Sequence, residues 1–208
     1  MLFKTFETYL KDRRGVFHIG ANVGEERDWY ITRGFTKVYW FEPNKAVFDK
    51  LVNNIKPYPN HMAINIGIHD TLKQATLHIA SNEGQSSSIL ELGLHATYHP
   101  KVHYIADQLI KLERMDDFIS KFKLDIKNFN FLNVDVQGVE LNVIKSFGKL
   151  IDKLDYIYAE VNEAELYKGC ALVGEIDEYL PTYNFIRIAT HMTRNQWGDG
   201  FYIKKTLL

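Results

Sequence analysis

The sequence predicts a single α/β domain in which helices cover both faces of an open, mostly parallel β-sheet. Short apolar runs typical of buried strands alternate with helical segments along most of the 208 residues. No linker or internal repeat divides the chain. Apolar residues make up 46% and charged residues 25% of the sequence, a balance typical of one globular domain that spans residues 1–208.

The chain opens with a segment whose apolar side chains recur with helical spacing. These side chains are Leu2, Phe3, Phe6, Tyr9 and Leu10. The segment lacks the long apolar region of an export signal, so we expect residues 1–14 to form a helix that packs on the core. No stretch approaches the ~18 consecutive apolar residues of a membrane span, so we expect no such span.

A strand, a helix and a second strand are expected next. Residues 15–20 and 37–41 are apolar runs, and the first ends in a glycine-containing loop. Between them, residues 25–33 begin with two acids and precede Gly34, an arrangement typical of a helix. A right-handed parallel crossover is the expected topology.

The middle of the chain repeats this alternation less regularly. Asn44 is placed to cap a helix whose apolar face contains Val47, Phe48, Leu51 and Ile55. Between residues 89 and 110 the pattern leaves the structure open. The other expected elements are strands at 61–68 and 73–79, a polar loop at 81–88, a pairing strand at 102–105 and a helix at 114–122.

The pattern is clearest in the C-terminal part of the chain. Two further strand–helix pairs are expected there, with strands at 129–136 and 154–161 and helices at 139–147 and 173–180. A terminal strand pair is expected at 183–188 and 201–203, with residues 197–200 as its turn.

Charge and cysteine content limit the partners and the compartment. The 25 Lys and Arg residues balance 26 Asp and Glu residues, so we expect no nucleic-acid partner and no broad attraction to acidic membranes. Cys170 is the only cysteine, which excludes an internal disulfide and favours a reducing, cytoplasmic location. His95, His99 and His103 recur every four residues across Pro100, and we expect a surface cluster and no metal site.

Ligands of open parallel sheets bind at the carboxyl ends of the strands, so the loop after the first expected strand is a candidate site. It reads Gly20-Ala21-Asn22-Val23-Gly24, and its glycines allow a tight turn and the close approach of a ligand. They would also suit a strand-to-helix turn without a ligand. Asn22 stands where the dinucleotide fingerprint GxGxxG has the glycine that admits pyrophosphate, so NAD fits poorly.

Acidic residues around this loop favour a cationic ligand that contains a nucleoside. Glu25, Glu26 and Asp28 oppose a phosphate and tolerate better the sulfonium and amino-acid tail of S-adenosylmethionine. Glu42 ends the second expected strand, 22 residues after the first glycine of the loop, where a carboxylate can accept hydrogen bonds from both ribose hydroxyls. The alternative for Glu42 is a solvated residue before Pro43.

Two more acids stand near the ends of expected strands. Asp135 closes the strand at 129–136, and Glu160 lies near the end of the strand at 154–161. A carboxylate here would point into the cleft beside the ligand and could orient or deprotonate an acceptor hydroxyl, so we expect Asp135, assisted by Glu160, to be catalytic. The alternatives are that Asp135 caps the following helix and that Glu160 begins a polar loop.

Several short motifs occur in order along most of the chain. They are Phe17–Gly24, Trp40–Pro43, Gly84 with Ser86–Leu90, Met115–Phe118, Asn133–Leu141, Glu160–Asn162 and Trp197–Gly200. Together they resemble the FkbM-type methyltransferases and are more specific than any one of them alone. The resemblance implies a Rossmann-like class I S-adenosylmethionine fold, with a mostly parallel seven-stranded sheet and an antiparallel C-terminal strand. It also implies methylation of an oxygen on a sugar, glycan or other polyhydroxylated small molecule.

The resemblance directs attention to the residues that would contact the methyl donor. We expect these to be His18, Gly20, Ala21, Asn22, Gly24, Glu42, Pro43, Gly67, Ser88, Asp135, Val136 and Gln137. The chain departs from the family pattern at His18, where an acid is usual, and at Asn133, where a lysine is frequent. Glu25 or Glu26 would then compensate in holding the amino-acid end of the donor.

Two other functions stay open at this point. One is an NAD-linked oxidoreductase on the same topology, which Asn22 disfavours. The other is a non-catalytic module that keeps a degenerate donor pocket, for which His18 is the hint.

Overall fold

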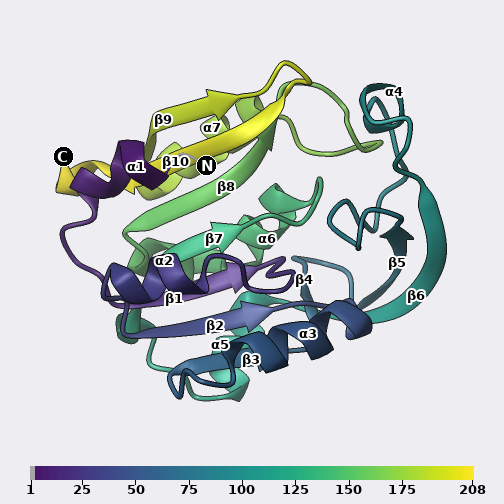
Figure 1. Cartoon of the computed structure of the whole chain (residues 1–208). Coiled ribbons are helices and arrows are strands. Elements are labelled where there is room, and N and C mark those ends of the chain that lie inside the picture. The colour runs from purple at the N-terminus through teal and green to yellow at the C-terminus, as the bar shows by residue number, and fades with distance from the viewer. Residues whose placement is uncertain (1–2) are drawn as a thin grey trace.

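The computed structural model describes residues 3–208; Met1 and Leu2, the second of which belongs to the expected N-terminal helix, lie outside the described residues. Seven strands form the main sheet in the order β3-β2-β1-β7-β8-β10-β9 (Figure 1). Their bounds are β1 Gly15–Ile19, β2 Lys37–Phe41, β3 His61–Ile64, β7 Phe129–Val134, β8 Tyr156–Asn162, β9 Phe185–Met192 and β10 Trp197–Lys204. β10 runs antiparallel to both of its neighbours, whereas β3, β2, β1, β7 and β8 pair in parallel. The predicted mostly parallel sheet with an antiparallel C-terminal strand is confirmed.

Helices cover both faces of this sheet. The helices are α1 Phe3–Phe6, α2 Arg27–Thr32, α3 Lys45–Ile55, α4 His95–Tyr98, α5 Met115–Lys121, α6 Glu140–Ser146 and α7 Val173–Tyr179, and all but α4 lie on a face of this sheet. Successive residues of a strand face opposite sides, so β1 contributes Val16 to one core and Phe17 to the other. Apolar residues of α5, α6 and α7 pack on the side of Phe17, and those of α1, α2 and α3 pack on the side of Val16.

A second, three-stranded sheet stands beside the carboxyl ends of the main strands (Figure 1). It contains β4 Gly67–Ile68, β6 Tyr104–Glu113 and β5 Gln74–Ala80, in this order. The single strand predicted at 61–68 is therefore wrong, because its two halves belong to different sheets. Asn65 explains the break, since its side-chain amide donates to the carbonyls of Glu42 and Pro43 at 2.8 and 3.2 Å and turns the chain away from β2. The undecided segment before residue 110 contains α4 and most of β6.

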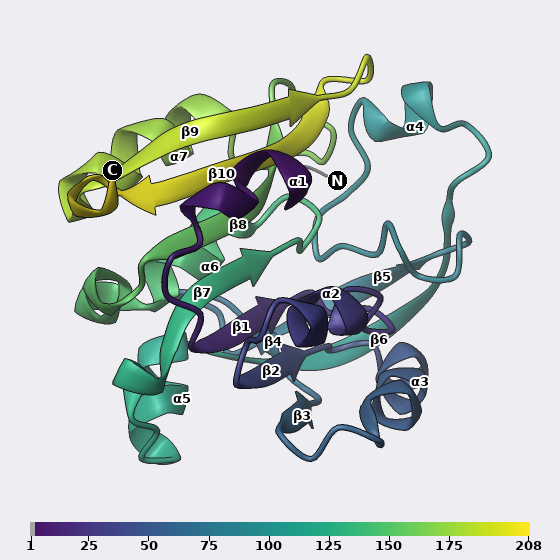
Figure 2. The same cartoon turned by 60° about the vertical axis from the view of Figure 1, so that its left-hand side comes forward.

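The predicted helix over residues 1–14 is also wrong in length. α1 continues only as a 3-10 turn at Glu7–Tyr9, after which the chain is extended. The N–H groups of Lys11 and Asp12 point to the hydroxyl of Tyr156 at 3.2 and 3.5 Å in place of helical partners. The expected packing on the core holds, because Phe6 stacks on Phe201 of β10 with ring centroids 3.9 Å apart. Figure 2 shows α1 lying beside β10.

The turn of the terminal hairpin differs from the prediction. Residues 197–200 begin β10, and residues 193–196 make the turn. Gly198 lets β10 approach β9 closely, since a Cβ there would stand 2.0 Å from the carbonyl oxygen of His191. Among the described residues, no helix is long and apolar enough to cross a bilayer.

Candidate active site

A cavity of about 530 Å³ opens where β1, β2, β7 and β8 end, within the range of about 300–1,000 Å³ usual for ligand pockets. Its wall contains both predicted catalytic residues and most of the predicted donor contacts. The predicted residues that line it are His18, Gly20, Ala21, Asn22, Glu42, Pro43, Gly67, Asp135, Val136, Gln137 and Glu160. The structure thus brings together residues that lie up to 142 positions apart in the chain, from His18 to Glu160.

The loop after β1 is shaped by contacts within the backbone. Gly20 has a φ of +81°, and a Cβ there would stand 1.7 Å from the carbonyl oxygen of Asp135. Glycine is therefore required for the loops after β1 and β7 to touch. Gly24, with a φ of +75°, closes the turn by donating its N–H to the carbonyl of Ala21 at 2.9 Å and does not line the cavity.

Glu42 is held in place by two backbone donors. Its Oε2 accepts the N–H of Asn22 at 2.9 Å, and its Oε1 accepts the N–H of Asn44 at 2.7 Å. Burial raises the pKa of Glu42 to about 7, against the lowering effect of these two hydrogen bonds. A carboxylate offers about four lone-pair sites, so acceptor capacity is left on the cavity side.

His18, Tyr30 and Asn133 form a buried chain of hydrogen bonds. The Asn133 amide donates to the hydroxyl of Tyr30 at 2.7 Å, and that hydroxyl contacts Nδ1 of His18 at 3.1 Å. Burial lowers the pKa of His18 to about 3, so its ring is neutral. The Tyr30 hydroxyl accepts from Asn133 and can give its own proton to Nδ1, which assigns the ring proton of His18 to Nε2.

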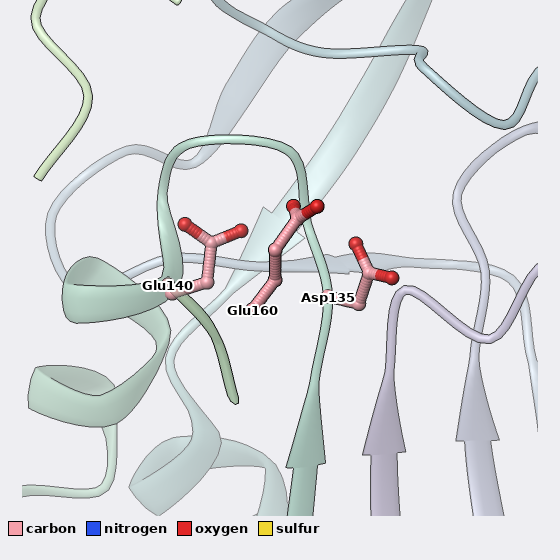
Figure 3. Close-up of side chains that lie close together, drawn as sticks. All are labelled: Asp135, Glu140 and Glu160. Atoms are coloured by element: carbon pink, nitrogen blue, oxygen red, sulfur yellow. The ribbon is translucent and has the colours of Figure 1, made fainter. Parts of the chain in front are cut away.

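Three carboxylates gather after β7 and on β8 (Figure 3). Asp135, Glu160 and Glu140 offer oxygen atoms that lie within 4.8 Å of one another. Gln137 connects two of them, because its Nε2 donates to Asp135 Oδ1 at 2.5 Å and to Glu160 Oε2 at 2.8 Å. The Gln137 Oε1 accepts the hydroxyl of Tyr167 at 2.6 Å. Both ends of this amide are thus engaged.

Glu140 holds the loop that presents Asp135 and Gln137. Its carboxylate accepts the N–H groups of Val136 and Gly138, both at 3.0 Å. Asp135 itself makes no helix cap, because α6 begins only at Glu140. The alternative that Asp135 caps the next helix is therefore wrong.

Burial and mutual repulsion weaken the acidity of this cluster. Burial, followed by the charge of Asp135, raises the pKa of Glu160 well above its ordinary value. The pKa of Asp135 is also raised by burial, against the effect of its hydrogen bonds with Gln137 and Glu160. The two acids share a hydrogen bond, so their titrations are linked and both carboxyl groups have raised pKa values.

Some predicted residues have other surroundings. Ser88 is 1% exposed and donates its hydroxyl to the carbonyl of Gln137 at 2.7 Å, outside the cavity wall. His95 is buried and contacts the hydroxyl of Ser86 at 3.1 Å, so the prediction of a surface histidine cluster is wrong for His95. His95 and His99 both line the cavity. The reason is that α4, which lies in the segment that the sequence pattern left open, places His95 against Ser86 of the loop at 81–88.

Comparison with known proteins decides the family. A family model described as the methyltransferase FkbM domain matches residues 18–187. The chain belongs to the FkbM methyltransferase family. It is an S-adenosylmethionine-dependent methyltransferase, which confirms the predicted fold, cofactor and reaction class. The NAD-linked oxidoreductase and the non-catalytic module, the two alternatives left open by the sequence, are not supported.

Other relatives agree with this assignment. The FkbM chain is similar to the 2-O-methyltransferase NoeI of Sinorhizobium fredii, with 24% identity over 178 residues that cover 82% of this chain and 72% of that protein. Magnesium protoporphyrin IX methyltransferase from Synechocystis PCC 6803, solved with bound S-adenosylmethionine, has a TM-score of 0.54 at 11% identity and covers 97% of this chain and 77% of that one. An rRNA methylase from Streptococcus thermophilus has a TM-score of 0.50 at 11% identity, with coverage of 97% and 92%. At these identities the solved structures show the shared class I methyltransferase fold.

Proposed function

We propose that this enzyme transfers the methyl group of S-adenosylmethionine to a hydroxyl oxygen of a sugar, glycan or other polyhydroxylated small molecule. The observation that carries the proposal is the pair of Asp135 and Glu160 in the wall of the cavity, both held by hydrogen bonds from the side-chain amide of Gln137. Similarity to a 2-O-methyltransferase supports oxygen as the atom that is methylated.

The cavity wall fits the donor at both of its ends. Glu42 keeps acceptor capacity for the two ribose hydroxyls after binding the N–H groups of Asn22 and Asn44. At the amino-acid end, the Nε2–H of neutral His18 suits the carboxylate of the donor. Glu26 suits its ammonium group, because Glu26 lines the cavity 3.9 Å from His18 while Glu25 is exposed. Bound S-adenosylmethionine supplies the methyl group as part of a sulfonium cation.

The acceptor hydroxyl is prepared by the residues after β7. Asp135 accepts the proton of the hydroxyl as the new oxygen–carbon bond forms and the sulfur–carbon bond breaks, which leaves S-adenosylhomocysteine. Glu160 shares a hydrogen bond with Asp135, and the Gln137 amide donates to both carboxyl groups and so fixes their positions. Alignment by this network accounts for a large part of the rate, since an in-line displacement depends on orientation.

A transfer assay tests the proposal. The purified enzyme is incubated with labelled donor and a panel of sugars, glycans and small hydroxylated metabolites, and the product that gains label is identified. Asp135→Asn should lower kcat about 100-fold or more while donor affinity changes little, since a positioned general base contributes about 10²–10⁴-fold. Asp49→Asn serves as the matched control, because Asp49 is exposed on α3 and pairs with Lys45 away from the cavity. Unchanged turnover in Asp135→Asn would exclude the catalytic role.

A further inference from the structure

The wall of the cavity carries a strong imbalance of charge. Among the residues that the structure describes, no Lys or Arg lines the cavity. The acids that line it are Glu25, Glu26, Glu42, Asp135, Glu160 and Asp199. The whole chain is nearly balanced, with 25 basic and 26 acidic residues, so this imbalance is a property of the site and not of the composition.

Among the described residues, no Lys or Arg forms an ion pair with any of these acids, although the charge of His191, outside the wall, acts to lower the pKa of Asp199. Backbone N–H groups bind Glu42, the Gln137 amide binds Asp135 and Glu160, and the Tyr158 hydroxyl binds Asp199. In the described part of the chain, the ion pairs that Lys and Arg make involve other acids, such as Asp155 with Arg14 and Asp177 with Arg187. The histidine nearest to Glu26 is His18, which is neutral.

The acids also act on one another. The charge of Asp199 adds to the effect of burial in raising the pKa values of Glu26, Asp135 and Glu160. A bound donor adds one net positive charge, because its sulfonium and ammonium groups outweigh its carboxylate. This single charge offsets only part of the negative potential, which a partly enclosed cavity concentrates.

We infer that the site selects a hydroxylated acceptor without negative charge, so that neutral and ammonium-bearing acceptors enter and those with a carboxylate, sulfate or phosphate are rejected. The inference rests on the proposed function and narrows its substrate class. It extends to nucleic acids and to nucleotide-activated sugars, whose phosphates would meet no Lys or Arg among the described residues of the wall. Several structural relatives are RNA methyltransferases, and the acidic wall separates this enzyme from such substrates.

Three matched probes test the selection. Methyl glucoside, methyl glucuronide and methyl 6-amino-6-deoxyglucoside share one ring and differ at one carbon by a neutral, an anionic and a cationic group. Their binding is measured by calorimetry and saturation-transfer NMR on the full chain saturated with S-adenosylhomocysteine, which cannot react. At low ionic strength we expect the glucuronide to bind about tenfold or more weakly than the neutral glucoside, a difference that salt reduces. A glucuronide that binds as well as the glucoside overturns the inference.

A second measurement tests the negative potential of the wall even if none of these three sugars binds. S-adenosylmethionine and S-adenosylhomocysteine differ by the charged methyl group, and their affinities are compared at about 20 mM and about 500 mM salt. The acidic wall predicts that salt weakens binding of the charged donor more than binding of the product. Equal salt dependence of the two overturns the inference.

Variants that each neutralise one lining acid test whether the difference in salt dependence arises from the acidic wall. Asp199→Asn and Glu25→Gln each remove one lining charge, and neither residue is part of the proposed donor or proton-transfer machinery. Both should narrow the difference between the two salt dependences, whereas Asp49→Asn should leave it unchanged. Glu25 is exposed, so its variant tests the idea even if Asp199→Asn fails to fold. Loss of methyl transfer with charge selection intact would count against the proposed reaction alone.

Discussion

Replacing Tyr167 with phenylalanine should loosen the carboxylate network without opening a cavity in the core. Tyr167 is 1% exposed, and its hydroxyl donates to Oε1 of Gln137 at 2.6 Å. The other end of the same amide donates to Asp135 and Glu160 at 2.5 and 2.8 Å. The Tyr167 hydroxyl therefore determines which end of the amide faces the carboxylates, because a flipped amide would lose this donor.

The magnitude follows from the single atom that is removed. Tyr167→Phe keeps the ring and removes the part-buried hydrogen bond to Gln137 Oε1, and such a bond contributes about 0.5–1.5 kcal/mol. We expect the free energy of unfolding to fall by this amount. If the amide is misplaced to the same extent in the transition state, kcat should fall about twofold to about tenfold, since about 1.4 kcal/mol corresponds to a factor of ten. Donor affinity should change little, because Glu42 and the loop after β1 are untouched.

Urea unfolding and initial-rate kinetics measure these two quantities. Tyr179→Phe is the matched control, because the Tyr179 hydroxyl makes a 3.4 Å contact with Tyr183 outside the cavity. The control should stay within about 0.5 kcal/mol of the parent in stability and should keep its kcat. The reasoning is refuted if Tyr167→Phe keeps the stability and the kcat of the parent enzyme.

Three further predictions concern the same site. Glu140→Gln should lower both kcat and the free energy of unfolding, the latter by about 1–3 kcal/mol, because one carboxylate oxygen that accepts the N–H groups of Val136 or Gly138 is lost; normal kinetics and urea unfolding in this variant would contradict it. The raised pKa of Glu42, about 7, means that the folded state keeps a proton that the unfolded state loses. The free energy of unfolding of the donor-free parent should therefore fall, relative to Glu42→Gln, as pH rises from about 4.5 to about 7, and parallel pH curves would refute this. EDTA should leave turnover unchanged, because N–H donors already occupy the oxygens of Glu140 and the facing oxygens of Asp135 and Glu160; restoration of lost activity by a divalent metal would contradict it.

The sequence predicts the parts of the site that depend on local order along the chain. Each strand that ends at the cavity is a short apolar run, and the polar residue that follows it, such as Glu42 or Asp135, marks the end of the strand. In a parallel sheet these ends lie on one edge, so residues far apart in sequence can be brought together by the strand pattern alone. For this reason the sequence could place the loop after β1 and both acids of the pair at one edge of the sheet, where they line the cavity.

Other parts depend on contacts that no local pattern encodes. The hydroxyls of Tyr30 and Tyr167 reach partners 103 and 30 positions away, and an aromatic residue in an apolar segment gives no sign of such a role. The strand at Gly67–Ile68 forms by pairing with Leu112 and Glu113, so the apolar run at 61–68 reads as one element when the partner is unknown. Glu140 carried a signal, since an acid at the start of a helix near a glycine is placed to bind free N–H groups.

The departure from the family pattern at His18 and Asn133 avoids burying a charged pair between two strands. An acid at position 18 and a lysine at position 133 would bury a charged pair between two central strands, at a large desolvation cost. Here both positions are neutral, and the hydroxyl of Tyr30 joins them by accepting from the Asn133 amide and contacting Nδ1 of His18. The negative charge that an acid at position 18 would bring stands one layer further out, on Glu26, whose pKa is raised to about 7 by burial. A bound cationic donor lowers the pKa of Glu26, so binding below pH 7 requires Glu26 to release a proton. Donor affinity should therefore increase as pH rises through 7.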